Sequence, residues 1–256
     1  MRLPYLVLVV SLIVTLGATY FFYQNSQNKD KTRFATEVNK SKTILENKVS
    51  GYMTMLKSIR AYIEADPSVD KEKISVFVKN LEMRNSYTGI QGIGYVASVS
   101  PEQRQELITK MNADGRKNFK IFPENSTGGN SYVVVYLESF VEDNQQPIGF
   151  DMASEPGRLQ TINAARDGGQ VSASGKVMLI ESGESKSYPG FLFYLPIYND
   201  GGVPLTVEDR RRLLKGFVYS PFRAGDFLND VQKTIAADYL AISLYDSEIS
   251  GENILA

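Results

Sequence analysis

Carboxylates are the side chains of this chain that could do acid–base chemistry, because its 256 residues include no histidine and no cysteine. That composition excludes Ser-His and Cys-His nucleophiles, two-histidine metal motifs, thiolate-ligated zinc and disulfides. Carboxylate catalysis and oxygen-ligand cations such as Ca²⁺ or Mg²⁺ remain compatible with the sequence. A net charge of −1 lacks the basic excess of a nucleic-acid-binding protein, so no nucleic-acid partner is expected.

Several acids fall within one short region, and Asp151 is the most informative of them. Glu142 and Asp143 lie in a polar turn and are interpreted as solvated. Asp151 follows an apolar run, 147–150, and precedes Ser154, which is a suitable helix cap. Asp151 could itself favour a helix N-terminus. If Ser154 takes that role, Asp151 is free to face a cavity as a hydrogen-bond acceptor. Both interpretations stay open.

Two glycine-containing stretches resemble phosphate-binding loops but fail on context. The stretch 92–97 matches a dinucleotide fingerprint, yet it continues as strand-like sequence to residue 99 instead of opening a helix, so its glycines predict a twisted or bulged strand. The stretch 169–176 has one residue too many between its glycines, and Val177 replaces the required Ser or Thr. Neither stretch indicates a nucleotide site.

The elements that would position these residues begin with an apolar N-terminus. No residue from Leu3 to Asn28 is charged, and 6–23 is long and apolar enough to cross a hydrocarbon core of about 30 Å. The run ends in aromatic residues at 20–23, which is typical of an anchor and not of a signal-peptide cleavage site. Positively charged residues flank both ends and do not fix the orientation. We expect a transmembrane anchor at 1–23.

A stalk helix is expected next, because apolar residues repeat at alternating spacings of four and three, as in a heptad seam. The seam comprises Leu45, Val49, Tyr52, Leu56, Ile59 and Ile63. It predicts either a dimer interface or packing on the chain's own domain. Asp66-Pro67 should end this helix, and a second helix fits about residues 70–85.

Beyond Gly89 the pattern is mixed α/β. Strands rich in β-branched and aromatic residues are predicted at 90–99, 132–137, 190–198, 216–219 and 239–245. A capping box at 100–103 predicts a helix running toward Asn112. A second helix is predicted from Ser154 to the glycines at 168–169.

Several blocks in order resemble the CHASE domain, the extracytoplasmic sensory module of bacterial sensor kinases and cyclases and of plant cytokinin receptors. They are Y95-V-A-S-V99, Y136-L-E-S139, G149-F-D-M-A-S-E-P-G-R158, A164-A-R-D-G-G169, G190-F-L-F-Y-L-P-I-Y198 and K215-G-F-V-Y-S-P-F222. The resemblance implies an α+β fold: a transmembrane helix and a long stalk helix leading to two tandem PAS-like α/β subdomains. The expected organisation is an anchor at 1–23, stalk and second helix at 24–88, a sensing domain with the distal subdomain at 89–231, and part of the membrane-proximal subdomain at 232–256.

The resemblance also implies a site. In the cytokinin-binding members the acid of the D-M-x-S segment accepts hydrogen bonds from the adenine ring, which assigns a ligand contact to Asp151. A backbone contact falls on Ala173, where the plant receptors have a larger aliphatic residue, with Ser174 beside it. Alternation along the strands assigns the pocket wall to residues for which ordinary core packing is the alternative: Tyr136, Phe191, Phe193, Leu195, Phe217 and Tyr219.

The functional expectation is a sensor for a small organic molecule, adenine-type or otherwise, with no cofactor and no metal. It would be a homodimer through the stalk helix, with its sensory part outside a bacterial inner membrane. Its output enzyme, a histidine kinase or diguanylate cyclase, is expected in a longer natural chain beyond residue 256. A periplasmic carboxylate-based hydrolase such as a glycosidase, with two convergent acids, and a membrane-tethered protein-interaction module are the competing hypotheses.

Overall fold

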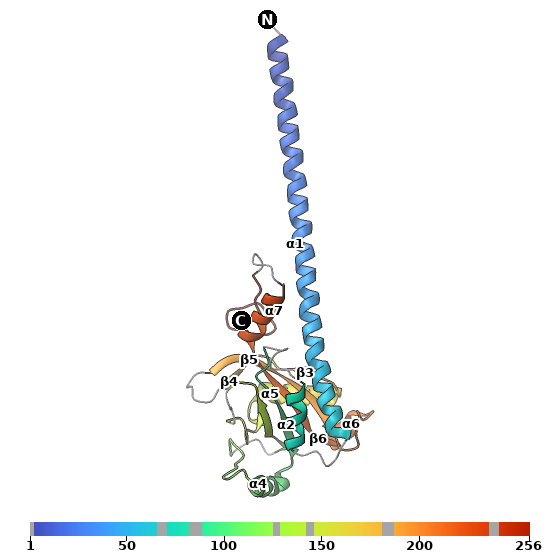
Figure 1. Ribbon diagram of the computed structural model, residues 1–256, viewed down its shortest axis with the longest axis vertical. Coiled ribbons are helices and arrows are strands. Elements are labelled where there is room, and N and C mark those ends of the chain that lie inside the picture. Colours follow the sequence, from blue (N-terminus) through green and yellow to red (C-terminus); the bar gives the residue numbers. More distant parts are fainter. Residues whose placement is uncertain are drawn as a thin grey trace.

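The computed structural model describes residues 3–65, 71–81, 89–124, 129–141, 146–180, 187–235 and 241–256. One helix, α1 (Leu3–Ala65), extends far from an α+β domain, and the N-terminus lies at its distant end (Figure 1). Its first part is the one span in the described residues that is long and apolar enough to cross a membrane, and none of that apolar window is buried. The segments expected to be anchor and stalk therefore form one continuous helix.

The heptad seam of α1 packs on its own domain. Tyr52, Leu56 and Ile59 are almost fully buried in the core cluster that they form with the sheet, and Leu45 and Val49 pack against its edge. Of the two interpretations of the seam, intramolecular packing is the one observed.

The sheet has six strands, all paired antiparallel, in the order β2-β1-β6-β5-β3, with β4 also paired to β5. Its strands are β1 (Gly92–Val99), β2 (Ser131–Ser139), β3 (Ser172–Ala173), β4 (Val177–Ile180), β5 (Ser187–Tyr198) and β6 (Leu214–Arg223). The predicted strands at 90–99, 132–137, 190–198 and 216–219 are thus confirmed, except that Ile90 forms an isolated bridge and Gln91 is outside β1.

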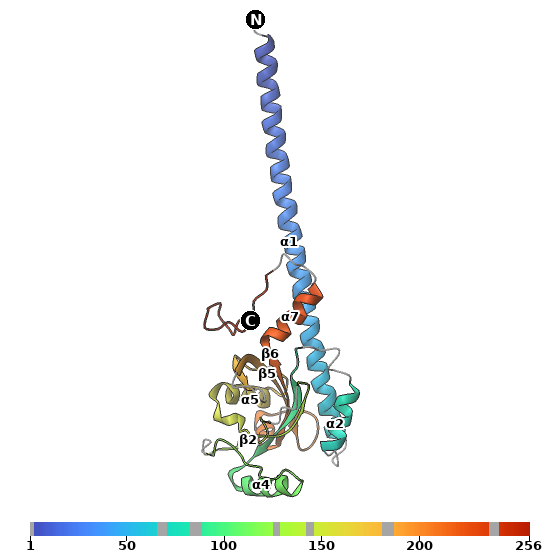
Figure 2. The ribbon, with the colours of Figure 1, turned by 60° about the vertical axis from the view of Figure 1, so that its left-hand side comes forward.

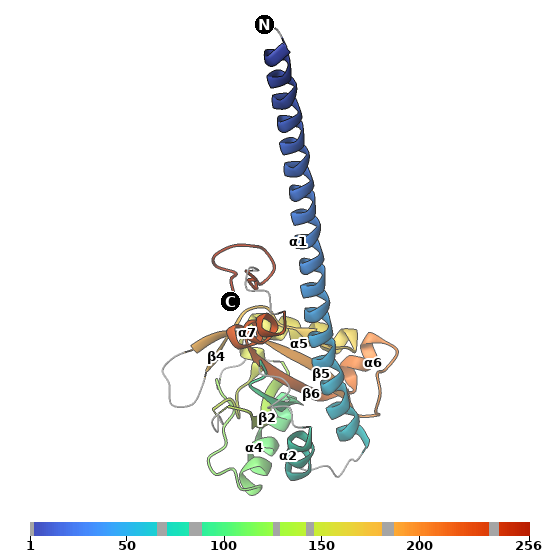
Figure 3. The same ribbon diagram turned by 45° about the horizontal axis from the view of Figure 1, so that its top comes forward.

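Helices cover the two faces of the sheet unequally. The lower half of α1, α2 (Lys71–Asn80) and α7 (Ala224–Ile235) pack on one face, and α5 (Pro156–Gly168) packs on the other (Figure 2). Helix α4 (Arg104–Ala113), after the short η1 (Pro101–Gln103), lies at the end farthest from the N-terminus (Figure 1). The short α6 (Val207–Arg212) and β4 lie at opposite sides of the domain (Figure 3).

Glycines of β1 permit a close approach at the centre of the sheet. A Cβ atom at Gly94 would lie 2.2 Å from the ring of Tyr219 and 2.5 Å from the carbonyl oxygen of Tyr136. The β1–β2 register shifts between Tyr95 and Val96, so the bulge expected for this stretch is present. Glycine is required there because the Tyr219 ring occupies the space that any side chain would need.

Other local predictions are only partly confirmed. The capping box is confirmed, since the Gln103 side chain accepts a hydrogen bond from the Ser100 backbone N–H at 3.1 Å. The strand predicted at 239–245 is wrong for 241–244, and Tyr245 forms only an isolated bridge with Ile254. Residues 239–240, and 82–85 of the predicted second helix, lie outside the described residues. The C-terminus lies on the side of the domain from which α1 leaves (Figure 1).

Candidate functional site

A cavity of about 220 Å³ opens on the face of the sheet opposite α1. The cavity lies among β2, β4, β5, β6, the start of α5 and the segment that precedes it. Most of its lining is apolar: Phe122, Leu137, Val141, Pro147, Phe150, Met152, Met178, Leu179, Leu192, Tyr219 and Pro221. Gln91, Ser139, Gln146, Glu155 and Arg158 supply its polar groups. Few polar groups in a mostly apolar concavity are typical of a small-molecule site.

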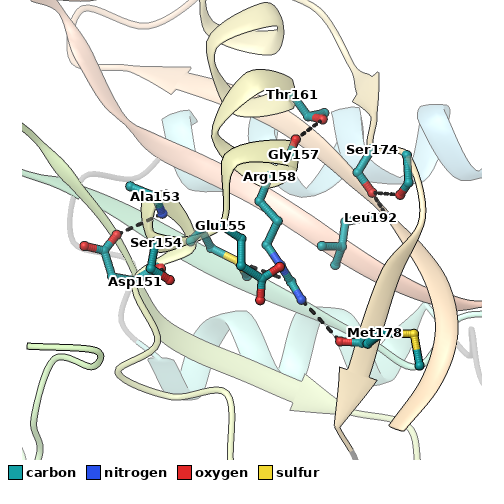
Figure 4. A network of polar contacts seen from close by, with 12 residues as sticks. Asp151, Ala153, Ser154, Glu155, Gly157, Arg158, Thr161, Ser174, Met178 and Leu192 are labelled. Carbon is teal, nitrogen blue, oxygen red and sulfur yellow. Dashed lines mark hydrogen bonds and ion pairs between the residues drawn. The ribbon is translucent and has the colours of Figure 1, made fainter. Parts of the chain in front are cut away.

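Arg158 places a buried positive charge in this wall. It belongs to the first turns of α5, and its Nε donates to Glu155 at 2.5 Å (Figure 4). Its terminal nitrogens make longer contacts, with Nη1 3.5 Å from the sulfur of Met152 and Nη2 3.4 Å from the carbonyl oxygen of Met178. The guanidinium also interacts with the Tyr194 side chain and lies 5.4 Å from the centroid of the Phe150 ring. The Arg158 side chain is 8% exposed, whereas that of Glu155 is 47% exposed. A guanidinium has five donors, so this one retains donor capacity toward the cavity.

Two further polar atoms in the lining are buried without a hydrogen-bond partner among the described residues. They are the hydroxyl of Tyr219 and the side-chain oxygen of Gln91. Burial raises the pKa of Tyr219, so its hydroxyl stays protonated and able to donate. Leaving such a group unpaired is unfavourable by about 1–3 kcal/mol, and exceptions of this kind are informative. Both atoms indicate a position where a ligand could complete the hydrogen bonding.

Asp151 does not line the cavity. Its carboxylate is fully buried, and one oxygen accepts hydrogen bonds from the backbone N–H groups of Tyr132, at 2.8 Å, and Ala153, at 3.0 Å. The other oxygen lies 3.7 Å from a guanidinium nitrogen of Arg104. Asp151 thus caps the short helix η2 (Met152–Ser154) and ties it to β2.

The expectation that Ser154 caps the following helix is wrong. Its hydroxyl donates to the carbonyl oxygen of Asp151 at 2.7 Å, and the N-cap position of α5 is Glu155, without a side-chain cap. The physical reason is the extra turn η2, which moves the start of α5 to Pro156. Asp151, the residue before η2, caps that turn with its side chain.

Ala173 and Ser174 lie near the sheet edge formed by β3, outside the cavity lining. Ala173 is exposed and pairs with Phe193 of β5. The hydroxyl of Ser174 accepts from the Leu192 N–H at 2.9 Å and donates to the Gly175 carbonyl at 2.8 Å. Both residues therefore serve the pairing of the edge strand in this structure.

The six predicted wall residues divide between the two faces of the sheet. Phe217 and Tyr219 lie on the cavity side, and Tyr219 lines the cavity itself. The predicted wall is wrong for β5, because Phe191, Phe193 and Leu195 pack in the core beneath α1. Tyr136 is directly opposite Tyr95, which packs against that same core. The hydroxyl of Tyr136 donates to Glu138 at 3.1 Å. Alternation holds along β5, but its even-numbered residues Leu192 and Tyr194 face the cavity side.

Sequence reasoning missed Arg158, Gln91 and the methionines of the lining. A signal for Arg158 existed: it is a charged residue three positions after Glu155, next to the apolar Leu159 and Ile162 of the same helix. Gln91 gave no such signal, because a single glutamine beside a strand is ordinary.

The described residues supply no pair of acids to this cavity. Glu155 is the one carboxylate in the cavity lining, and Glu138 is on the opposite face, accepting from Ser75 at 2.8 Å. No group of three or more potential metal ligands is found within the described ranges. Glu142 and Asp143 fall outside those ranges. Among the described residues, the two convergent acids that a glycosidase needs are therefore not seen in this cavity.

The chain was compared with family models, curated proteins and solved structures. The sequence model of the CHASE domain matches residues 67–256. Among solved structures, the periplasmic sensory domain of the Campylobacter jejuni chemoreceptor Tlp1 is similar, with a TM-score of 0.38 and 12% identity, covering 81% of this chain and 62% of that chain. A search of curated proteins gave no match. On the extent of the family match, which includes the whole sheet and its cavity, the chain belongs to the CHASE domain family, a family of sensory and not catalytic domains.

Proposed function

We propose that this chain is the extracytoplasmic sensing part of a bacterial membrane receptor of the kinase or cyclase type, and that it binds a small organic molecule in the cavity. The N-terminal part of α1 would anchor it in the inner membrane, with the residues after the span outside. One observation carries the proposal: a cavity with unpaired buried polar groups lies on one face of a sheet whose other face holds the helix that continues into the apolar span.

The effect of ligand binding would pass from the cavity to α1 through the sheet. Neighbouring residues of β5 point to opposite sides, so Leu192 lines the cavity while Phe191 and Phe193 pack beneath α1. A ligand that binds one arrangement of the sheet more tightly shifts the population toward it by its differential affinity. A change in the position of β5 would then move the residues that pack beneath α1, and with them α1 itself. Lys48 of α1 also pairs with Asp230 of α7 at 2.6 Å, which links two helices on that face.

Asp151 is proposed to act in this site through position. Its two backbone hydrogen bonds hold η2 against β2, and the residues that follow, Met152, Glu155 and Arg158, line the cavity. An acid that fixes the backbone of the wall explains why it stands where the strand-like segment ends. In this arrangement it contributes to binding without touching the ligand.

Dimerisation remains part of the proposal, through a different part of α1. The seam from Leu45 to Ile63 is used within the chain, so a dimer through the stalk would use the helix closer to the membrane. Phe34 and Val38, one helical turn apart, are 58% and 42% exposed there. Because the chain has no cysteine, Val38→Cys would report on this directly by forming a crosslinked dimer under oxidation.

The test of the binding proposal is a thermal-shift screen of the full chain in detergent micelles against adenine derivatives, amino acids, carboxylates and sugars. A ligand at a hundred times its dissociation constant should stabilise the fold by about 2.7 kcal/mol. Met178→Trp blocks the cavity at a residue that is 46% exposed, and Leu205→Trp, at a residue 94% exposed and outside the lining, is the matched control.

The expected result is a stabilising ligand whose effect disappears in Met178→Trp and persists in Leu205→Trp. A ligand effect of equal size in both variants would place binding outside the cavity and contradict the proposal. Absence of any stabilising small molecule would favour a protein-interaction module instead.

A further inference from the structure

The cavity contains two opposite charges, and their balance restricts the ligand. Arg158 is buried, Glu155 is half-exposed beside it, and the two form an ion pair. A ligand with one net charge would leave that charge uncompensated in a mostly apolar space, which is strongly unfavourable. The ligand that fits this site therefore has no net charge, although it can carry one charge of each sign.

The positive side of the cavity is arranged to bind an acceptor. Glu155 engages Nε of Arg158, and the two terminal nitrogens make long contacts to Met152 and Met178. The guanidinium also interacts with the Tyr194 side chain and lies over the Phe150 ring, 5.4 Å from its centroid. These neighbours leave some of its five donors for a ligand. Terminal guanidinium nitrogens bind a carboxylate through two parallel hydrogen bonds. The Tyr219 hydroxyl, buried and without a partner among the described residues, supplies another donor to the same cavity.

A complementary acceptor is provided by Gln91. Its side-chain nitrogen donates to a carboxylate oxygen of Asp226 at 3.3 Å, which fixes the orientation of the amide. Its side-chain oxygen is consequently the atom left buried without a partner among the described residues. An ammonium group would satisfy this oxygen, and the Glu155 carboxylate provides the opposite charge for it.

Apart from the uncharged Ser139 and Gln146, the rest of the lining is apolar. Leu137, Leu192 and Pro221 of the sheet, with Phe122 and Phe150 across from them, offer no further ionised group to a ligand. The body of the ligand should therefore be a hydrocarbon or aromatic side chain, for which burial contributes about 25 cal/mol per Å².

From these groups together we infer that the cavity takes a small zwitterion with an apolar side chain, the class of the apolar α-amino acids. Its carboxylate binds Arg158 and Tyr219, and its ammonium group binds Gln91 and Glu155. The inference rests on the proposed sensing function and specifies the ligand class for that same cavity. A simple carboxylate would leave Gln91 unpaired and add a net negative charge, and a simple amine would leave Arg158 unused.

The test is calorimetric titration of the full chain in detergent micelles with L-valine, L-leucine, L-isoleucine, L-methionine and L-phenylalanine. The matched analogues of leucine are 4-methylpentanoate, which lacks the ammonium group, isopentylamine, which lacks the carboxylate, and L-leucinamide, whose carboxylate is neutralised. An adenine derivative is titrated beside them. At least one of the amino acids should bind, and each leucine analogue should bind on the order of ten- to a hundredfold more weakly than leucine.

Two tyrosine variants separate recognition from folding. Tyr219→Phe should weaken amino-acid binding about tenfold. Tyr198→Phe should leave the affinity unchanged, because the Tyr198 hydroxyl donates to the carbonyl oxygen of Arg166, outside the cavity lining. Circular dichroism confirms that both variants are folded before titration.

Equal affinity for leucine and 4-methylpentanoate would overturn the zwitterion class. Binding of the adenine derivative with none of the amino acids, abolished by Met178→Trp, would overturn it too while leaving the sensor cavity in place. Failure of all these compounds and of the wider screen to bind would overturn both the ligand class and the proposed function.

Discussion

The unpaired hydroxyl of Tyr219 should lower the free energy of unfolding of the ligand-free protein. This hydroxyl is buried without a hydrogen-bond partner among the described residues, and the ring packs over Gly94 and against Tyr194, whose centroid is 6.4 Å away. Tyr219→Phe keeps the ring and removes only the oxygen. A buried unsatisfied group is unfavourable by about 1–3 kcal/mol, so the variant should raise the free energy of unfolding of the ligand-free protein by about 1 kcal/mol.

Thermal unfolding, followed by near-ultraviolet circular dichroism of the full chain in detergent, measures this directly. For a domain of this size about 1 kcal/mol corresponds to a rise of roughly 2–4 °C in Tm. Tyr198→Phe is the matched control, because its hydroxyl donates to the carbonyl oxygen of Arg166 at 2.7 Å. Losing that bond should lower Tm by a similar amount.

The opposite signs of the two variants are what the reasoning requires. A stabilised Tyr219→Phe that also loses ligand response would show that the hydroxyl is kept for binding at the expense of stability. The reasoning is refuted if Tyr219→Phe lowers Tm as much as Tyr198→Phe does, since the Tyr219 hydroxyl would then have a partner in the folded protein.

Three further predictions concern the stability of the fold. Asp151→Ala leaves two buried backbone N–H groups without an acceptor and should lower the free energy of unfolding by about 3 kcal/mol in urea titrations, whereas Asp151→Asn, which keeps an acceptor oxygen, should lose less than half of that; equal losses would contradict the capping role. Gly94→Ala places a Cβ 2.2 Å from the ring of Tyr219 and should destabilise the fold by about 2–3 kcal/mol, with wild-type stability as the contrary result. Hydrogen bonds from Arg211 and Arg166 hold the pKa of Asp167 well below its usual range, so its contribution to stability is present above about pH 4 and is lost as the pH falls through the lower folded-state pKa. The free energy of unfolding of the wild type should therefore fall more steeply below pH 4 than that of Asp167→Asn. Parallel curves for the two proteins would contradict the pairing.

Much of the fold follows from local patterns in the sequence. The apolar run at the N-terminus, the glycines of β1, the capping box at 100–103 and four strand segments each have a short-range cause, and each is found. The heptad seam of α1 was also visible, but spacing alone does not distinguish a partner helix from the chain's own sheet. Tertiary packing decided that point, because Tyr52 and Leu56 fill the core beneath β5 and β6.

The site was less predictable, for reasons of register. Alternation along β5 was correctly expected, but nothing local states which set of side chains faces the cavity, and both sets are apolar. Phe193, expected in the pocket wall, therefore lies on the opposite face, and Tyr194 lies on the cavity side. The role of Asp151 depended on one extra turn, η2, which a single short segment does not specify. Gln91 joins the site only because β6 lies beside it, with its backbone N–H donating to Pro221 at 2.9 Å.

The central claim is that occupancy of the cavity is transmitted across the sheet to α1. The absence of cysteine allows spin labels at Lys57→Cys, on the exposed side of α1, and Gln160→Cys, on the exposed side of α5. We would measure the distance distribution between them by pulsed electron paramagnetic resonance, with and without the stabilising ligand. The account predicts a shifted distribution on binding, and no shift when Met178→Trp is added. An unchanged distribution in a protein that calorimetry shows to be saturated with ligand would contradict it.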